Sequence, residues 1–286
     1  STLSSSSAAS DVYKRQLSEV FLQQPKLKPQ DFDQMSELEQ VESLFSAEGS
    51  VNLTKISDPV IKDTLESLST IREIQKANGV HACHRYIISN CRGAIDVARL
   101  YALCRFCGWN TQDFTLDFVP LFETISDLRQ SETSMRILYE SSCYREHVSQ
   151  RSDRQTVMLG FSDGTKDGGY LMANWAIYAA KESLTRISRQ FDIEVCFFDG
   201  RGGPPARGGG STYKFYSSLG KNIEANQIQL TVQGQTISSY YGTEVGAIHN
   251  LRQLIAAGLE NNLAVSYTHL RAHETVLDLV CRLLLE

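Results

Sequence analysis

The sequence predicts an α/β fold with a parallel β-sheet. Short segments rich in apolar and β-branched residues alternate along the chain with longer segments of helical character, a pattern typical of βα units. Three consecutive predicted strands are each followed directly by a charged or glycine-rich loop. Because functional groups in parallel α/β folds lie in the loops after the carboxyl ends of the strands, these three loops are the strongest candidates for a functional site.

The predicted elements follow from periodicity and from helix-stop signals. The strands are expected at 85–89, 116–121, 156–161 and 193–198, with a further strand or hairpin at 229–237. Helices are expected from Pro59 onward, at 94–106, from about 126–127, at 170–189 and at 244–261, and the segment 162–169 is expected to be a turn. An apolar stripe supports the first of these helices: Ile61, Leu65, Leu68, Ile71 and Ile74.

The two ends differ from the middle. Residues 1–16 are rich in serine and lack periodicity, and they contain no apolar core of about 7–15 residues that a secretory signal would need. Residues 265–286 end in an amphipathic run. Both ends resemble translated adapter sequence, and on that interpretation residues 17–264 are an internal part of a longer protein. The alternative is that the ends are native tails, one disordered and one helical.

Composition excludes several classes of protein. The 286 residues are 42% hydrophobic and 21% charged, which excludes global disorder. The 28 Lys and Arg against 33 Asp and Glu give a net charge of −5, so electrostatic binding to nucleic acid is not expected. No apolar run reaches the roughly 18 residues of a membrane helix. The seven scattered cysteines indicate reduced thiols and a cytoplasmic location.

A glycine-rich segment at 200–210 is the strongest candidate for ligand binding. Glycine backbone can approach a ligand closely and direct N–H groups at it, and Arg201 and Arg207 add guanidinium groups that match phosphate or carboxylate oxygens. This pattern favours a pocket for an anion. The alternatives are a flexible surface loop and an RNA-binding segment of the RGG type, although such segments usually occur as repeats.

Two carboxylates stand directly after predicted strands. Glu123 and Asp163 are hard oxygen donors, and from neighbouring loops they could hold Mg²⁺ or Mn²⁺ together with water and substrate oxygens. The alternative is that each carboxylate only caps a helix. Lys166 could offset the negative charge of a substrate, or it could be a solvated lysine in a turn.

Other candidate sites are weaker. Cys104 and Cys107 have the spacing of a redox or zinc motif, but they fall in a predicted helix without a second pair, which favours core thiols. His81 and His84 have no matching cluster elsewhere in the sequence, so a metal site is not expected there. The sequence contains no Walker loop.

Four motifs, in order along the chain, resemble those of phosphoenolpyruvate carboxylase. Residues 119–124 (VPLFET) match that family's segment of the same sequence, and 157–169 (VMLGFSDGTKDGG) resemble its VMxGYSDSxKDxG signature. Residues 198–210 (FDGRGGPPARGGG) resemble FHGRGGxxxRGGGP, and 231–235 (TVQGQ) resemble TVQGE. The resemblance extends over about 17–264.

The resemblance implies a cytoplasmic lyase that fixes carbon dioxide. The family uses Mg²⁺ or Mn²⁺ to join bicarbonate to phosphoenolpyruvate, which yields oxaloacetate, an intermediate of the tricarboxylic acid cycle, and phosphate. It also implies a homotetramer for the full-length protein and feedback inhibition by aspartate or malate. No nucleic acid or membrane partner is implied.

By motif position, the resemblance assigns roles to individual residues. Glu123 and Asp163 are expected to bind the metal, Lys166 to hold the anion derived from bicarbonate, Arg201 to bind phosphate and Arg207 to act in catalysis. Substrate binding is also expected from the backbone of the loop glycines Gly202, Gly203, Gly208 and Gly209. Asp199 stands among the catalytic positions where the family usually has His, so it either has a changed role or disables the carboxylation step.

The family's core is a closed eight-stranded (β/α)₈ barrel of the TIM type, surrounded by many helices. Only four or five barrel-like strands are predicted here, so a partial barrel is expected. Because an open apolar sheet leaves unpaired edges, the isolated chain is expected to fold poorly and to be inactive. Two other functions remain open: an inactive remnant that binds anions, and another phosphoenolpyruvate-using barrel enzyme such as a phosphotransferase.

Overall fold

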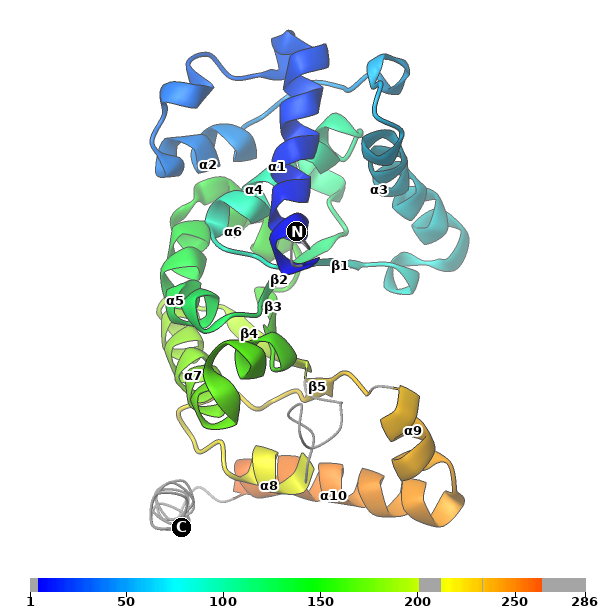
Figure 1. The fold of residues 1–286 in the computed structure, drawn as a ribbon, viewed down its shortest axis with the longest axis vertical. Coiled ribbons are helices and arrows are strands. Elements are labelled where there is room, and N and C mark those ends of the chain that lie inside the picture. The colour runs from blue at the N-terminus through cyan, green and yellow to red at the C-terminus, as the bar shows by residue number, and fades with distance from the viewer. Residues whose placement is uncertain (1–4, 201–211, 233, 264–286) are drawn as a thin grey trace. The chain divides into compact units, whose positions relative to one another are not determined.

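The computed structural model describes residues 5–200, 212–232 and 234–263. These residues form two compact units (Figure 1). Unit 1 comprises the described residues up to Phe122 together with Gln130–Thr156, and unit 2 comprises Glu123–Arg129 together with the described residues from Val157 onward.

The described strands form a five-stranded sheet in the order β1-β2-β3-β4-β5. Their bounds are β1 Arg85–Ile88, β2 Asp117–Phe122, β3 Arg154–Gly160, β4 Glu194–Gly200 and β5 Gln229–Leu230. The pairs β1–β2 and β4–β5 are parallel, with Arg85 opposite Asp117 and Phe198 opposite Gln229. The predicted α/β fold with a parallel sheet is therefore confirmed, whereas closure into part of a barrel stays a prediction.

The described part of the chain also contains ten α-helices (Figure 1). They are α1 Ser5–Gln23, α2 Glu37–Phe45, α3 Pro59–Asn78, α4 Ala94–Phe106, α5 Ile125–Glu140, α6 Ser142–Gln150, α7 Ser162–Gln190, α8 Thr212–Ser217, α9 Gly234–Tyr241 and α10 Glu244–Leu263. None of these helices combines the length and apolar content that a membrane crossing needs.

Helix α4 is the centre of the core of unit 1. Nearly all of its residues are buried, including Val97, Leu100 and Leu103, and both α1 and α2 pack against it (Figure 1). Burying one large apolar side chain stabilises a folded protein by about 2 kcal/mol. This helix is therefore a main source of the unit's stability. The sequence predicts α4 at its observed bounds, but it shows no periodicity for α1, which begins at Ser5.

Local capping fixes where two helices of unit 1 begin. The Ser36 hydroxyl accepts a hydrogen bond from the backbone N–H of Glu39, and the Glu39 carboxylate accepts one from the N–H of Ser36, which is a complete capping box for α2. The Asp58 carboxylate accepts from the N–H groups of Val60 and Ile61 at the start of α3. Each cap satisfies backbone donors that have no partner within the helix.

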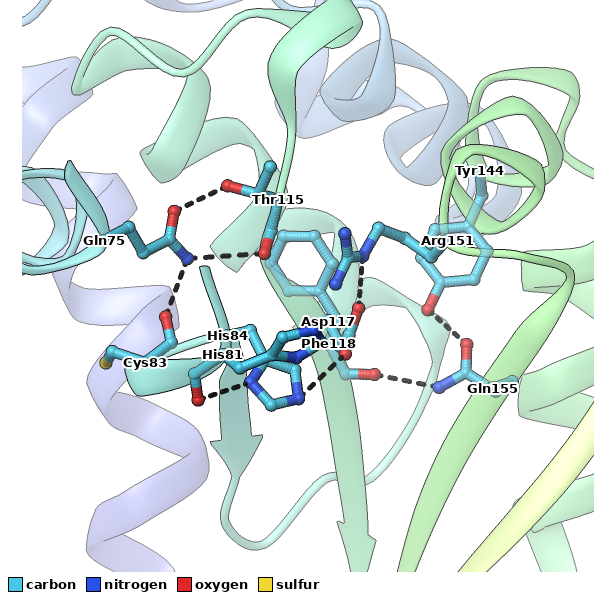
Figure 2. A network of polar contacts seen from close by, with 10 residues as sticks. All are labelled: Gln75, His81, Cys83, His84, Thr115, Asp117, Phe118, Tyr144, Arg151 and Gln155. Carbon is cyan, nitrogen blue, oxygen red and sulfur yellow. Dashed lines mark hydrogen bonds and ion pairs between the residues drawn. The ribbon is translucent and has the colours of Figure 1, made fainter. Parts of the chain in front are cut away.

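Two buried glutamines tie helices of unit 1 to strands or to the segments just before them (Figure 2). The Gln75 amide on α3 donates to the carbonyl of Cys83 at 2.7 Å and accepts from the Thr115 hydroxyl at 2.6 Å. The Gln155 amide donates to the carbonyl of Phe118 at 2.8 Å and accepts from the Tyr144 hydroxyl at 2.8 Å. Because buried amides are costly without partners, these bonds specify the packing of this unit.

In unit 2, two predictions about helices and strands are wrong. The expected turn at 162–169 is helical and forms the first part of α7, which bends at Gly169, where φ is 78°. The expected strand at 229–237 ends at Leu230, and 234–241 form helix α9. The alternation of apolar and polar residues at 229–237 suggested one longer strand. In the structure only β5 pairs, at the edge of the sheet, and the residues of α9 pack against α10 instead.

Candidate functional site

Glu123 lies between the end of β2 and the start of α5. The next residue, Thr124, begins the helix through a reciprocal cap: its N–H donates to the Asp127 carboxylate at 3.1 Å, and its hydroxyl accepts from the Asp127 N–H at 3.2 Å. The cap of α5 is thus supplied by Thr124 and Asp127. Glu123 itself is half-buried.

The end of β3 lies directly against Glu123. A Cβ atom on Gly160 would come within 3.1 Å of Glu123 Cγ and within 3.3 Å of its Cα. A Cβ on Gly164 would lie 3.4 Å from the Glu123 carbonyl oxygen, and Gly164 immediately follows Asp163. The backbone around Asp163 therefore lies beside the backbone of Glu123.

A second contact fixes the second turn of α7 against the start of α5. The Asp167 carboxylate accepts a hydrogen bond from the N–H of Ile125 at 3.2 Å. A Cβ on Gly168 would come within 3.1 Å of the Ile125 side chain, so the two segments are in close contact. This bond satisfies one of the unpaired N–H groups at the N-terminus of α5.

Asp163 and Lys166 form an ion pair on the surface of α7. The Lys166 ammonium lies 2.6 Å from Asp163 Oδ1, with the lysine side chain 69% exposed and the aspartate side chain 36% exposed. Such an exposed pair contributes at most about 1 kcal/mol to stability. Both groups are therefore accessible to a ligand.

The end of β4 completes the group of strand ends. A Cβ on Gly200 would lie 3.0 Å from the carbonyl oxygen of Leu159 and 3.5 Å from Gly160 Cα. A side chain at this position would require one of the two backbones to shift by a few tenths of an ångström, whereas glycine allows the close approach. Gly160 consequently stands between Glu123 and Gly200.

The arginines and glycines of the predicted anion-binding segment lie outside the described residues. These positions are Arg201, Gly202, Gly203, Arg207, Gly208 and Gly209. Their roles stay predictions.

The Asp199 side chain is engaged in a buried ion pair. The Lys181 ammonium on α7 lies 2.8 Å from both carboxylate oxygens, and the side chains of Lys181 and Asp199 are only 1% and 3% exposed. The hydroxyl of Tyr216 on α8 donates to Asp199 Oδ2 at 2.7 Å. We call Lys181, Asp199 and Tyr216 the Asp199 cluster.

Sequence reasoning missed Lys181 and Tyr216. A signal for Lys181 was present, since Ala173, Ile177, Ala180 and Leu184 form the buried face of α7 and Lys181 falls on that face. A lysine on an apolar helix face requires a buried anionic partner. No comparable signal marks Tyr216.

The carboxylates fit a divalent cation by their chemistry. Glu123 and Asp163 supply hard oxygen donors of the kind that Mg²⁺ and Mn²⁺ prefer, and the absence of a Cβ at Gly160 avoids a tight contact with Glu123 Cγ. Within the described residues, no group of three His, Cys, Asp or Glu side chains is arranged around a metal position.

Two other predicted positions are explained by packing. His84 Nδ1–H donates a hydrogen bond to the His81 carbonyl at 3.1 Å, and its Nε2 lies 3.9 Å from the Asp117 carboxylate, which also binds Arg151 (Figure 2). Cys104 is a free thiol in the core, and burial raises its pKa well above the usual value. The prediction of a core thiol at Cys104 is confirmed.

Comparison with known proteins gives consistent results. A family model described as phosphoenolpyruvate carboxylase matches residues 8–283. The phosphoenolpyruvate carboxylase of Chromobacterium violaceum is 37% identical over 206 residues, which are 69% of this chain and 23% of that protein. That of Corynebacterium diphtheriae is 44% identical over 148 residues, 52% of this chain and 16% of that protein.

A third relative extends the match further along the chain. The phosphoenolpyruvate carboxylase of Nitrosomonas europaea is 36% identical over 238 residues, 79% of this chain and 25% of that protein. The chain thus spans a quarter or less of the length of these relatives. Because the family model covers nearly the whole chain, this chain belongs to the phosphoenolpyruvate carboxylase family.

Proposed function

We propose that this chain is a catalytic segment of a cytoplasmic enzyme that carboxylates phosphoenolpyruvate with bicarbonate, giving oxaloacetate and phosphate. The observation that carries the proposal is the position of Gly160, which has Glu123 on one side and Gly200 on the other. Metal-binding carboxylates and an anion-binding segment need to lie near each other for this reaction, and the residues predicted for both roles follow these strands in the sequence.

In the proposed reaction, a bicarbonate oxygen attacks the phosphoryl group and the bond from phosphorus to the enol oxygen breaks. The products of this step are carboxyphosphate and the enolate of pyruvate. Carboxyphosphate then releases CO₂ and phosphate, and a carbon–carbon bond forms between CO₂ and the enolate. Every species is an anion apart from CO₂, so the site needs fixed positive charge and must limit access of water.

Different residues of this chain would bind the metal ion and the anions of this reaction. Glu123 and Asp163 would hold Mg²⁺ or Mn²⁺, which supplies Lewis-acid stabilisation of the developing negative charge. Lys166 now pairs with Asp163 at 2.6 Å, and its exposed ammonium can turn to a bicarbonate-derived anion when Asp163 binds a cation. Arg201 and Arg207 would bind and orient the phosphate and carboxylate groups.

Two features of the family complete the proposal for the whole protein. A homotetramer and inhibition by aspartate or malate are proposed on the basis of family membership.

The proposal is tested in a full-length carboxylase that carries this segment. Phosphate release and oxaloacetate formation should both depend on bicarbonate and on Mg²⁺ or Mn²⁺. Glu123→Gln should sharply weaken Mn²⁺ binding because it removes one anionic ligand, whereas Glu140→Gln, on the exposed end of α5, should leave that affinity unchanged.

Three outcomes would count against the proposal. Unchanged Mn²⁺ affinity in Glu123→Gln would remove Glu123 from the metal site. Binding of phosphoenolpyruvate without turnover would favour an inactive anion-binding remnant. Turnover that needs a nucleotide, or that needs no bicarbonate, would favour a phosphotransferase.

A further inference from the structure

The Asp199 cluster joins the two ends of the glycine- and arginine-rich segment. Asp199 is the second-to-last residue of β4. Tyr216 lies on α8, which begins at Thr212, just after the segment. Their hydrogen bond of 2.7 Å links positions that are 17 residues apart in the sequence. Both side chains are almost completely buried.

The third member of the cluster makes this link charged. The Lys181 ammonium bridges both oxygens of Asp199, and the rings of Phe197, Phe215 and Tyr216 surround it at 5.2, 5.0 and 5.6 Å. Aromatic faces attract a desolvated cation, so these rings stabilise the Lys181 ammonium in its buried position. The ammonium in turn holds the Asp199 carboxylate in place as an acceptor for Tyr216.

The geometry also restricts what Asp199 can do in the reaction. Its two carboxylate oxygens already accept three polar contacts from Lys181 and Tyr216 at 2.7–2.8 Å. Its side chain is 3% exposed, so substrate has little access to it. A proton acceptor or metal ligand needs an accessible oxygen atom, which this carboxylate does not offer.

We propose that Asp199 is a positioning residue: together with Lys181 and Tyr216 it holds the end of β4 against α7 and α8, rather than reacting with substrate. Elements that are already fixed in place lose less conformational entropy when a ligand binds beside them. The effect on substrate binding rests on the proposed function, whereas the link between the two ends does not.

The test uses a full-length carboxylase that carries this segment. Tyr216→Phe removes the link but keeps the ion pair, so trypsin should cleave after Arg201 and Arg207 several-fold faster, as measured by mass spectrometry, with little change in Tm. Tyr178→Phe, on the half-buried side of α7, is the matched control and should leave the cleavage rate unchanged.

A double-variant cycle tests the ion pair. Lys181→Met and Asp199→Asn each leave one buried group without its charged partner, and each should lower Tm by roughly 10 °C. The double variant should recover most of that loss, since both charges are then absent. If the loss of Tm in the double variant equals the sum of the losses in the two single variants, the ion pair does not contribute to the link.

The substrate constant separates this proposal from the proposed function. In Tyr216→Phe, the KM for phosphoenolpyruvate should rise several-fold with a smaller change in kcat. If Tyr216→Phe is cleaved faster but its KM is unchanged, the positioning role of the Asp199 cluster is supported. The same result would count against a phosphate-binding role for the segment. An unchanged cleavage rate in Tyr216→Phe would overturn the positioning role of Asp199.

Discussion

Gly160 lies in contact with Glu123, and a methyl group on Gly160 would come within 3.1 Å of Glu123 Cγ. The same glycine faces Gly200 on its other side, where the two backbones are close enough that a Cβ on Gly200 would lie 3.5 Å from Gly160 Cα. The Glu123 side chain therefore takes its position from a glycine on the neighbouring strand.

Gly160→Ala should displace Glu123 and lower activity. The added Cβ is too close to both the side chain and the backbone of Glu123, so one of the two segments must shift by several tenths of an ångström. We expect the Mn²⁺ affinity of a full-length carboxylase carrying Gly160→Ala to fall at least as clearly as its Tm. The measurement is Mn²⁺ titration alongside thermal unfolding.

Gly234→Ala is the matched control for that substitution. A Cβ on Gly234 would meet no atom within 4 Å, and the residue begins helix α9, where alanine is well tolerated. Metal affinity should be unchanged. If Gly160→Ala also leaves metal affinity unchanged, Glu123 is not held in place by this contact.

Arg201→Lys should weaken the binding of phosphoenolpyruvate. The substitution keeps the positive charge but loses the planar fork that binds two phosphate oxygens at once. We expect KM to rise by about tenfold, which corresponds to the loss of one charge-assisted hydrogen bond of about 1.4 kcal/mol. Steady-state kinetics measures this, and Arg252→Lys on the exposed face of α10 provides the control. An unaltered KM would argue against a phosphate contact at Arg201.

Unit 1 should lose stability as the pH falls below about 6.5. His147 is buried among aromatic rings, its Nδ1 has no hydrogen-bond partner among the described residues, and burial lowers its pKa from 6.5 to about 4. Between those two values the unfolded chain binds a proton that the folded chain does not, so protonation favours unfolding. At pH 5 the loss is about 2 kcal/mol.

Urea unfolding at pH 7 and pH 5 measures this effect. His147→Gln, which cannot titrate in this range, should reduce the difference between the two pH values even if it lowers stability at both. Should the variant and the parent protein respond to pH in the same way, the loss originates elsewhere.

The isolated chain should aggregate. Helix α10 exposes a stripe of large apolar residues, with Val245 81% exposed and Ile255 62% exposed. The other exposed members of the stripe are Ile248, Leu251 and Leu259. Exposed apolar stripes of this kind promote self-association. Size-exclusion chromatography should show large species, and thermal unfolding should be broad.

Polar substitutions on α10 test whether its apolar stripe causes the aggregation of the isolated chain. Val245→Gln with Ile255→Gln should increase the fraction of small species, whereas Leu38→Gln, at an exposed position on α2, should not. A monomeric parent chain with a sharp thermal transition and measurable oxaloacetate formation would refute the expectation that the chain is inactive and poorly folded on its own.

The sequence by itself determined the fold class and the family. Apolar runs as strongly patterned as those of β3 and β4 form strands almost regardless of context, because they are buried on both faces of a parallel sheet. It also placed Glu123 and Asp163 at the ends of strands. These features depend on neighbouring residues in the chain, which a sequence displays directly.

Only the tertiary structure decided what Asp199 binds and how α7 and α9 form. Lys181 is 18 residues from Asp199 in the sequence and lies on another element, so no local pattern joins them. Residues 162–168 are helical because α5 supplies a packing surface and a hydrogen bond through Ile125. Long-range burial and charge pairing override local preference at these positions, since their free energies arise only when distant segments meet.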